Sequence, residues 1–165
     1  MIKSTTLLTA VVLFALTMVC MASRPHETDI AGPRIAGVKT TAYSDNPSDN
    51  GIYGSQNALG TELKSGHVTS AAADWSRYPV GTRFRIVETG QEYIVDDYGS
   101  ALVGTGTIDL YKTSDAAVDR WGVRRVTIEI IEWGSPERSL RILKERGKMR
   151  HVREMVEALQ EQGAV

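Results

Sequence analysis

The sequence predicts a mainly-β protein, built as a small closed barrel of about six short strands with one short helix and a C-terminal helical tail. Short runs of β-branched, aromatic or small residues alternate with glycine-rich turns along the middle of the chain, whereas helical spacing dominates only after residue 134. Because the strands are short and the turns between them are rich in glycine, we favour a closed barrel over an open sandwich. We find no internal repeat.

The expected strands are Val38–Tyr43, His67–Ala73, Arg83–Glu88, Glu92–Asp96, Thr107–Tyr111 and Arg125–Glu132. The last of them is the clearest. Val126, Ile128 and Ile130 recur at every second position, so they must share a buried face. The polar stretch from Ser44 to Asn57 collects turn-forming residues and indicates a long surface loop.

A short helix is expected between the last two strands. Ser114 is a candidate N-cap, Asp115 favours the positive end of a helix, and Gly122 follows Trp121 as a stop signal.

The tail, residues 135–165, is expected to be an amphipathic helical arm. Ser135 and Pro136 form a helix start, and the helix is expected to break at Gly147 and then resume. Beyond this break, apolar residues keep a helical spacing with charges between them: Met149, Val152, Val156 and Leu159. Such an arm packs on its own domain or on a second copy of the chain, and the second alternative would give self-association through the tail. A membrane-surface role is the lesser alternative.

The N-terminus predicts export. Residues 1–22 contain Lys3, an apolar run from Leu7 to Val19 and a small residue at Ala22, a pattern typical of a secretory signal peptide. The alternative is an uncleaved anchor, but the apolar run is shorter than the ~20 residues that span a bilayer. We therefore expect cleavage near Ala22, a polar leader over residues 23–37, and a location in the periplasm, in the cell wall or at the outer membrane.

Composition excludes several classes of function. The chain has 19 basic and 20 acidic residues, and a nearly neutral protein of this kind is not expected to bind nucleic acid. Cys20 lies in the segment expected to be removed, which excludes thiol catalysis. His26, His67 and His151 lack ligand spacing, so we expect no metal, and no dinucleotide loop or other cofactor motif is present.

Three aspartates are the candidate catalytic residues. Asp97 and Asp109 each adjoin apolar strand residues, where a partly buried carboxylate holds a proton more readily, and Asp74 precedes a turn. Such an acid can protonate a leaving oxygen, and paired carboxylates are the usual requirement for glycoside cleavage. Each aspartate also has an ordinary structural explanation in turns and caps. Asp96 is expected to point to the opposite strand face and to be solvated.

Several short motifs, which follow one another along the chain in a fixed order, carry a resemblance to a known family. They are Thr41-Ala42-Tyr43, Gly60-Thr61, Ala72-Ala73-Asp74, Pro79-Val80-Gly81-Thr82, the segment from Asp97 to Gly104, Ile108-Asp109-Leu110-Tyr111, and the segment from Trp121 to Val126. With these motifs, residues 38–134 resemble the 3D domain, a family named for three aspartates and found in bacterial cell-wall-lytic proteins, including the membrane-bound lytic transglycosylase A type.

The resemblance implies a six-stranded double-psi β-barrel that acts on peptidoglycan glycan strands. It places the catalytic acid/base at Asp109, supported by Asp97 and Asp74, with Tyr43 and Thr61 lining the substrate groove. Relatives of this type cleave the bond between N-acetylmuramic acid and N-acetylglucosamine and leave 1,6-anhydromuramyl ends. Tyr98 and Val103 depart from the residues common in the family, so a non-catalytic, expansin-like barrel that binds glycan remains the alternative.

Overall fold

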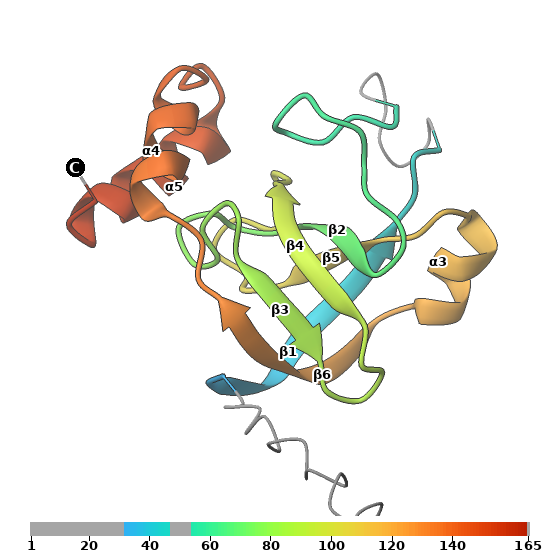
Figure 1. The fold of residues 1–165 in the computed structure, drawn as a ribbon. Helices are drawn as coiled ribbons and strands as arrows, with labels where there is room; N and C mark the ends of the chain where they lie inside the picture. The colour runs from blue at the N-terminus through green and yellow to red at the C-terminus, as the bar shows by residue number, and fades with distance from the viewer. Residues whose placement is uncertain (1–31, 47–53, 165) are drawn as a thin grey trace, which may run out of the picture. The chain divides into compact units, whose positions relative to one another are not determined.

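Six strands close into one barrel in the computed structural model, which describes residues 32–46 and 54–164 (Figure 1). Around the barrel the strands follow the order β1-β5-β2-β4-β3-β6. Their bounds are β1 Arg34–Tyr43, β2 Val68–Ala72, β3 Arg83–Ile86, β4 Glu92–Asp97, β5 Ile108–Tyr111 and β6 Arg124–Glu132. The prediction of a mainly-β protein with a closed barrel is confirmed. The predicted signal peptide, residues 1–22, lies outside the described residues.

Parallel and antiparallel pairs are mixed in this barrel. β1 pairs with β5 and β2 pairs with β4 in parallel, and the remaining neighbours among the described strands are antiparallel. Parallel partners need a crossover connection, which separates this arrangement from a simple series of hairpins. The topology agrees with the small double-psi barrel that the resemblance implied.

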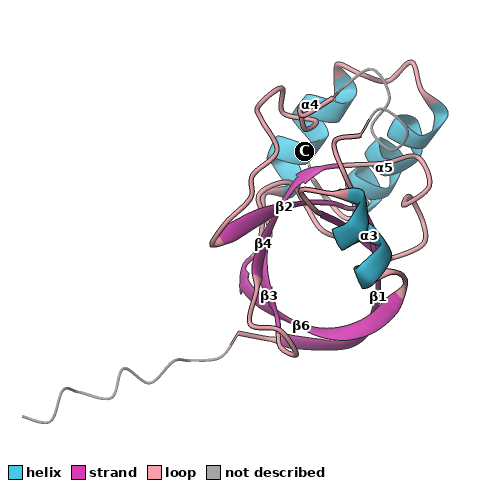
Figure 2. Ribbon diagram, turned by 90° about the vertical axis from the view of Figure 1, so that its right-hand side faces the viewer, coloured by secondary structure: helices cyan, strands magenta, loops and turns pink. Residues whose placement is uncertain are grey.

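The inside of the barrel is filled by alternate residues of its strands. Val126, Ile128 and Ile130 of β6 are buried there, as the period of two predicted, and Phe84 and Tyr93 stack with ring centroids 5.5 Å apart. The end-on view in Figure 2 shows the strands surrounding this space and the short helix α3 (Asp115–Trp121) in front of one opening.

β1 begins earlier than the predicted start at Val38. Arg34 and Ile35 already pair with β6, and the register shifts between Ile35 and Val38. Gly37 lies in this irregularity with a φ of 71°, a conformation that glycine adopts without steric cost. Gly37, the last residue of the predicted polar leader of residues 23–37, therefore lies in a bulge inside β1, and this strand already begins at Arg34.

The tail forms two helices, α4 (Pro136–Lys144) and α5 (Arg150–Glu161), with the predicted break between them. Ser135 caps α4, since its side chain accepts a hydrogen bond from the Arg138 N–H at 3.0 Å. At α3, by contrast, Ser114 occupies the N-cap position without a side-chain cap bond, while Gly122 ends the helix as predicted. None of the described helices is long and apolar enough to cross a membrane.

The helical tail packs on its own barrel. Its buried residues belong to the same hydrophobic cluster as the barrel interior: Leu140, Leu143, Val152, Met155 and Leu159. The expectation of packing on the same domain is confirmed, but one residue of the predicted apolar face is wrong. Met149 is exposed just before α5, and Met155 is buried in its place. Ala31–Val165 form one compact unit.

Candidate functional site

Asp97 and Asp109 lie in one row on the outer face of the barrel. Ala72 on β2 is the direct partner of both, through β4 on one side and β5 on the other. Thr41 on β1 continues the row as the partner of Asp109. Direct cross-strand partners share a face of the sheet. Because Ile108, the neighbour of Asp109, is fully buried inside the barrel, the row faces outward.

Asp109 is held by a short hydrogen bond from the neighbouring strand. The Thr41 hydroxyl donates to Asp109 Oδ1 at 2.6 Å. Asp109 is partly exposed. A partly exposed carboxylate that a neighbouring hydroxyl orients can act as a general acid or base.

Asp97 is held more tightly. Its Oδ1 accepts hydrogen bonds from the backbone N–H groups of Ala58, at 3.1 Å, and Tyr98, at 2.9 Å. Its Oδ2 lies 3.4 Å from the Tyr43 hydroxyl, a long contact for two oxygens. Burial raises the pKa of Asp97 to about 6, and the negative charge of Asp96 adds to the effect, against the opposing influence of the hydrogen bonds. This group therefore exchanges its proton close to neutral pH.

Asp96 corrects the sequence-based expectation of a solvated neighbour on the opposite face. It is 1% exposed. The reason is a bulge in β4: Ala71 pairs with Val95 but Ala72 pairs with Asp97, so Asp96 is the extra residue. A bulge breaks the alternation of side chains that the prediction assumed.

The Asp96 carboxylate binds three donors at the barrel surface. Its Oδ2 accepts from Lys64 Nζ at 2.7 Å, from Ser70 Oγ at 2.9 Å and from Asn57 Nδ2 at 3.1 Å. Its Oδ1 is buried and accepts no hydrogen bond within the described structure. The network ties the loop that contains Asn57 and Lys64 to β2 and β4, next to Asp97.

Tyr43 stands among these carboxylates. Burial, followed by the negative charges of Asp97, Asp96 and Asp109, raises the pKa of the Tyr43 phenol far above its ordinary value. The phenol therefore stays neutral and can donate a hydrogen bond. The carboxylates near Tyr43 come from β4 and β5, and Tyr43 itself ends β1, so the fold brings together residues that are far apart in the sequence.

Asp74 occupies a different position from the other two predicted aspartates. Its Oδ1 accepts from the backbone N–H and the hydroxyl of Ser76, at 2.9 and 2.6 Å, and its Oδ2 accepts from the Gly104 N–H at 2.8 Å. It is 4% exposed. Asp74 thus fastens the loop that joins β4 to β5 and positions the segment between Asp97 and Asp109.

We compared the sequence with models of known protein families. A family model for the 3D domain matches residues 69–132, a range that contains Asp74, Asp97 and Asp109. The chain contains a 3D domain. This family is associated with peptidoglycan-related functions. A comparison with curated proteins found no match, so the closer similarity to the lytic transglycosylase A type stays a prediction.

Thr61, the second predicted substrate-binding residue, lies just before the matched part of the 3D domain and is exposed. Its hydroxyl exchanges hydrogen bonds with the Asn57 side chain, at 2.9 and 3.1 Å, and its backbone N–H donates to Asn57 Oδ1. Asn57 in turn donates to Asp96. Thr61 therefore shapes the loop at the edge of the carboxylate cluster, and its contact with substrate stays a prediction.

Sequence reasoning did not assign roles to four residues of this site: Thr41, Asn57, Lys64 and Ser70. The role of Thr41 could have been predicted from the sequence, because Thr41 belongs to a motif and precedes Tyr43 by two positions. The other three depend on how a turn-rich loop folds over the barrel, which no local pattern encodes. No group of metal-binding side chains occurs in residues 32–46 and 54–164.

Proposed function

We propose that this protein is an exported peptidoglycan-cleaving enzyme of the lytic transglycosylase type, in which Asp109 is the acid/base. The observation that carries the proposal is the outward row of Asp97 and Asp109 beside a neutral Tyr43 hydroxyl. A glycan strand is a long polymer, and a row on the outer face of the barrel can receive it without an end having to enter a closed cavity.

The chemistry needs a single proton carrier. Protonated Asp109 gives its proton to the glycosidic oxygen as the bond to C1 of N-acetylmuramic acid breaks, and N-acetylglucosamine leaves. The 6-hydroxyl of the same muramyl residue attacks C1, and the Asp109 carboxylate takes the hydroxyl proton. Asp109 thus regains the proton that it gave to the leaving group, and the product is a 1,6-anhydromuramyl end.

The neighbours have supporting roles in this proposal. Asp97, whose pKa is about 6, sets the charge of the site as it gains or loses its proton near neutral pH. Thr41 orients Asp109, and the neutral Tyr43 hydroxyl lies beside Asp97 at the edge of the groove that we propose for the glycan. Asp74 supports the site indirectly, because it holds the loop that precedes β5.

The test is cleavage of purified peptidoglycan by the protein lacking residues 1–22, with soluble products analysed by mass spectrometry. Wild type is expected to release fragments with anhydromuramyl ends, and Asp109→Asn is expected to release none while it keeps its circular dichroism spectrum. Asp119→Asn is the matched control, because Asp119 is an exposed acid on α3, a helix that contributes no residue to the carboxylate cluster. Activity should be unchanged in this control.

Other products would overturn the proposal in defined ways. Ordinary reducing ends would show a hydrolase on the same scaffold, and full activity in Asp109→Asn would remove this residue from the chemistry. If the protein pellets with insoluble wall and releases no fragment, the non-catalytic glycan-binding barrel is correct. Detection of the chain in the cytoplasmic fraction with an intact N-terminus would contradict export.

A further inference from the structure

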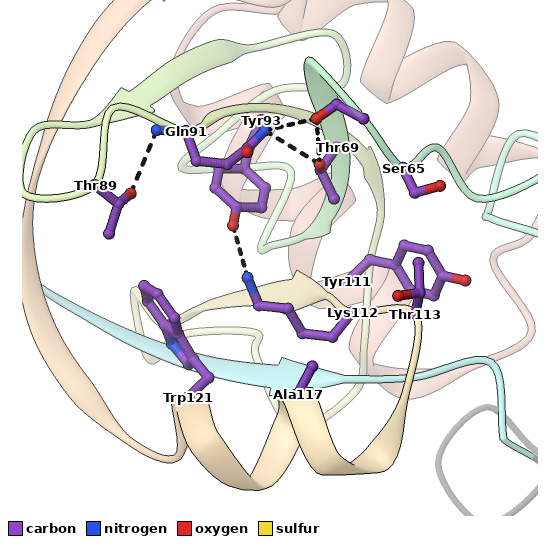
Figure 3. A pocket seen from close by; sticks show the side chains of 11 residues that line it. Ser65, Thr69, Thr89, Gln91, Tyr93, Tyr111, Lys112, Thr113, Ala117 and Trp121 are labelled. Atoms are coloured by element: carbon purple, nitrogen blue, oxygen red, sulfur yellow. Dashed lines mark hydrogen bonds between the residues drawn. The ribbon is translucent and has the colours of Figure 1, made fainter.

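A cavity of about 380 Å³ opens at the end of the barrel beside α3 (Figure 3). Its walls come from four elements: Thr69 of β2, Tyr93 of β4, Tyr111 of β5, and Ala117 and Trp121 of α3. The volume falls within the range of small-molecule sites, roughly 300–1,000 Å³. None of the residues that line it is acidic, and none of the predicted catalytic aspartates contributes to it.

Lys112 supplies the charge in this cavity. It follows β5 directly, and its backbone N–H donates to the Tyr43 carbonyl at 2.8 Å, which fixes the start of the side chain. Figure 3 shows the side chain reaching across to Tyr93, where Nζ donates to the phenol oxygen at 2.8 Å. An ammonium group has three donors. Among the ion pairs of the described residues, none involves Lys112.

Aromatic rings hold the ammonium in place without neutralising it. Lys112 Nζ lies 4.6 Å from the ring centroid of Trp121 and 5.3 Å from that of Tyr93. The Arg124 guanidinium lies 4.2 Å from the Trp121 centroid and brings a second positive charge to the same ring. Half-burial and the charge of Arg124 both lower the pKa of Lys112, in keeping with a pocket that has an excess of positive charge.

We propose that this cavity is a second binding site that takes the carboxylate of a small ligand on Lys112 and the ligand's carbon skeleton on the Trp121 ring. The carboxylate of a ligand can accept hydrogen bonds from the N–H groups of Lys112 Nζ that do not bind Tyr93. Its negative charge also compensates the ammonium group for the water that it loses on burial. The hydroxyls of Thr69 and Thr113 and the amide of Gln91 also line the cavity, and they suit the further polar groups of a sugar or a peptide.

The source of the carboxylate is inferred from the neighbouring site, and this step rests on the proposed function. Tyr111 lines the cavity, and its ring centroid lies 5.7 Å from that of Tyr43 in the carboxylate cluster. Asp109 and Lys112 are three positions apart on an extended chain, about 10 Å. A glycan strand over Asp109 carries carboxylates on its lactyl groups or on its peptide stems, and these are the groups that we expect Lys112 to bind.

Binding is tested without cleavage, by the NMR signal of the Trp121 indole N–H in the protein lacking residues 1–22. The probes are N-acetylmuramic acid, its carboxamide, N-acetylglucosamine, and L-alanyl-D-glutamate. N-acetylmuramic acid or the dipeptide is expected to shift the Trp121 signal saturably, and the one that does so identifies a lactyl or a peptide carboxylate. The carboxamide and N-acetylglucosamine lack the charge and should bind at least tenfold more weakly.

Variants assign the effect to the ammonium. Lys112→Met is expected to weaken binding at least tenfold, and Lys112→Arg should retain most of it because the charge is kept. Lys39→Met is the matched control, because Lys39 is an exposed lysine on β1 outside the cavity. Equal shifts with acid and carboxamide, no shift with any probe, or unchanged binding in Lys112→Met would each overturn this inference.

The outcome also separates this site from the proposed function. If the protein cleaves the wall but binds no carboxylate at Trp121, the second site is rejected and the proposed enzymatic function stands. Carboxylate binding by a protein that releases no wall fragments would keep the second site and reject the enzyme.

Discussion

Asp97 and Asp109 are second neighbours across the sheet, separated only by Ala72 of β2, which pairs with both. Adjacent strands lie about 4.8 Å apart, so the two aspartate Cα atoms are roughly 10 Å apart. Ala72 between them carries only a methyl group and is buried in a cluster with Tyr43, Leu63, Leu102 and Tyr111. The site therefore depends on strand order, since β2 could not lie between the two acids in a sequential meander.

Asp97→Asn is expected to change how stability depends on pH. The pKa of Asp97 rises from 3.8 to about 6 on folding, so between these values the folded state binds a proton that the unfolded chain has released. Stability from this group is therefore fully present below pH 3.8 and is lost as pH rises to about 6. The loss amounts to about 1–3 kcal/mol.

Asparagine at position 97 keeps the oxygen that accepts hydrogen bonds from the N–H groups of Ala58 and Tyr98, but its side chain cannot ionise. Urea unfolding of wild type and Asp97→Asn from pH 4 to pH 8 should show the variant gaining stability relative to wild type up to about pH 6, then a constant difference. A constant difference over the whole range would mean that the pKa of Asp97 does not rise on folding.

Asp96 and Lys64 are expected to be energetically coupled. Asp96→Asn removes the charge that Lys64 and two neutral donors bind, and we expect a loss of about 1–3 kcal/mol at pH 7. Lys64→Met leaves a carboxylate on a residue that is 1% exposed without its cation and should cost at least as much. In a double-mutant cycle by urea unfolding, the double variant should lose about 1 kcal/mol less than the sum. Simple additivity would show that the ion pair contributes nothing.

Asp74→Asn is expected to loosen the loop between β4 and β5. Both Asp74 oxygens accept from N–H groups, so an amide in either orientation turns its NH₂ toward one of these donors. We expect a loss of about 1–3 kcal/mol and faster hydrogen exchange at the Gly104 amide. Ser76→Ala, which removes only one side-chain hydrogen bond, is the milder control. If Gly104 exchange is unchanged in Asp74→Asn, the hydrogen bond to its N–H does not hold the loop.

Leu143→Ala tests whether the tail is part of the barrel's core. Leu143 of α4 is fully buried in the cluster that includes the barrel interior, so truncation should cost about 2–5 kcal/mol. Met149→Ala, at a residue that is 44% exposed, should change stability by less than about 0.5 kcal/mol. Thermal or urea unfolding should also remain a single transition in Leu143→Ala. Two separate transitions would show that the tail unfolds independently.

Much of the fold was predictable because its signals are local. The period of two in β6, the glycine that ends α3 and the serine that caps α4 each depend on a few neighbouring residues, and the structure confirms all three. The closed barrel also followed from short strands and frequent turns. The boundary at β1 was not predictable, because Gly37 signals a turn in sequence and serves as a bulge in a strand.

By itself, the sequence determined the strands, the helices, the family motifs and the identity of Asp97, Asp109 and Tyr43 as candidates. Only the tertiary structure decided which acidic side chains lie near one another. A one-residue bulge, invisible in a local pattern, turns Asp96 into a buried partner of Lys64, and hydrogen bonds across the chain make Asp74 an anchor for a loop. Hydrophobic periodicity fixes which side of a strand is buried, whereas register and strand order fix which side chains become neighbours.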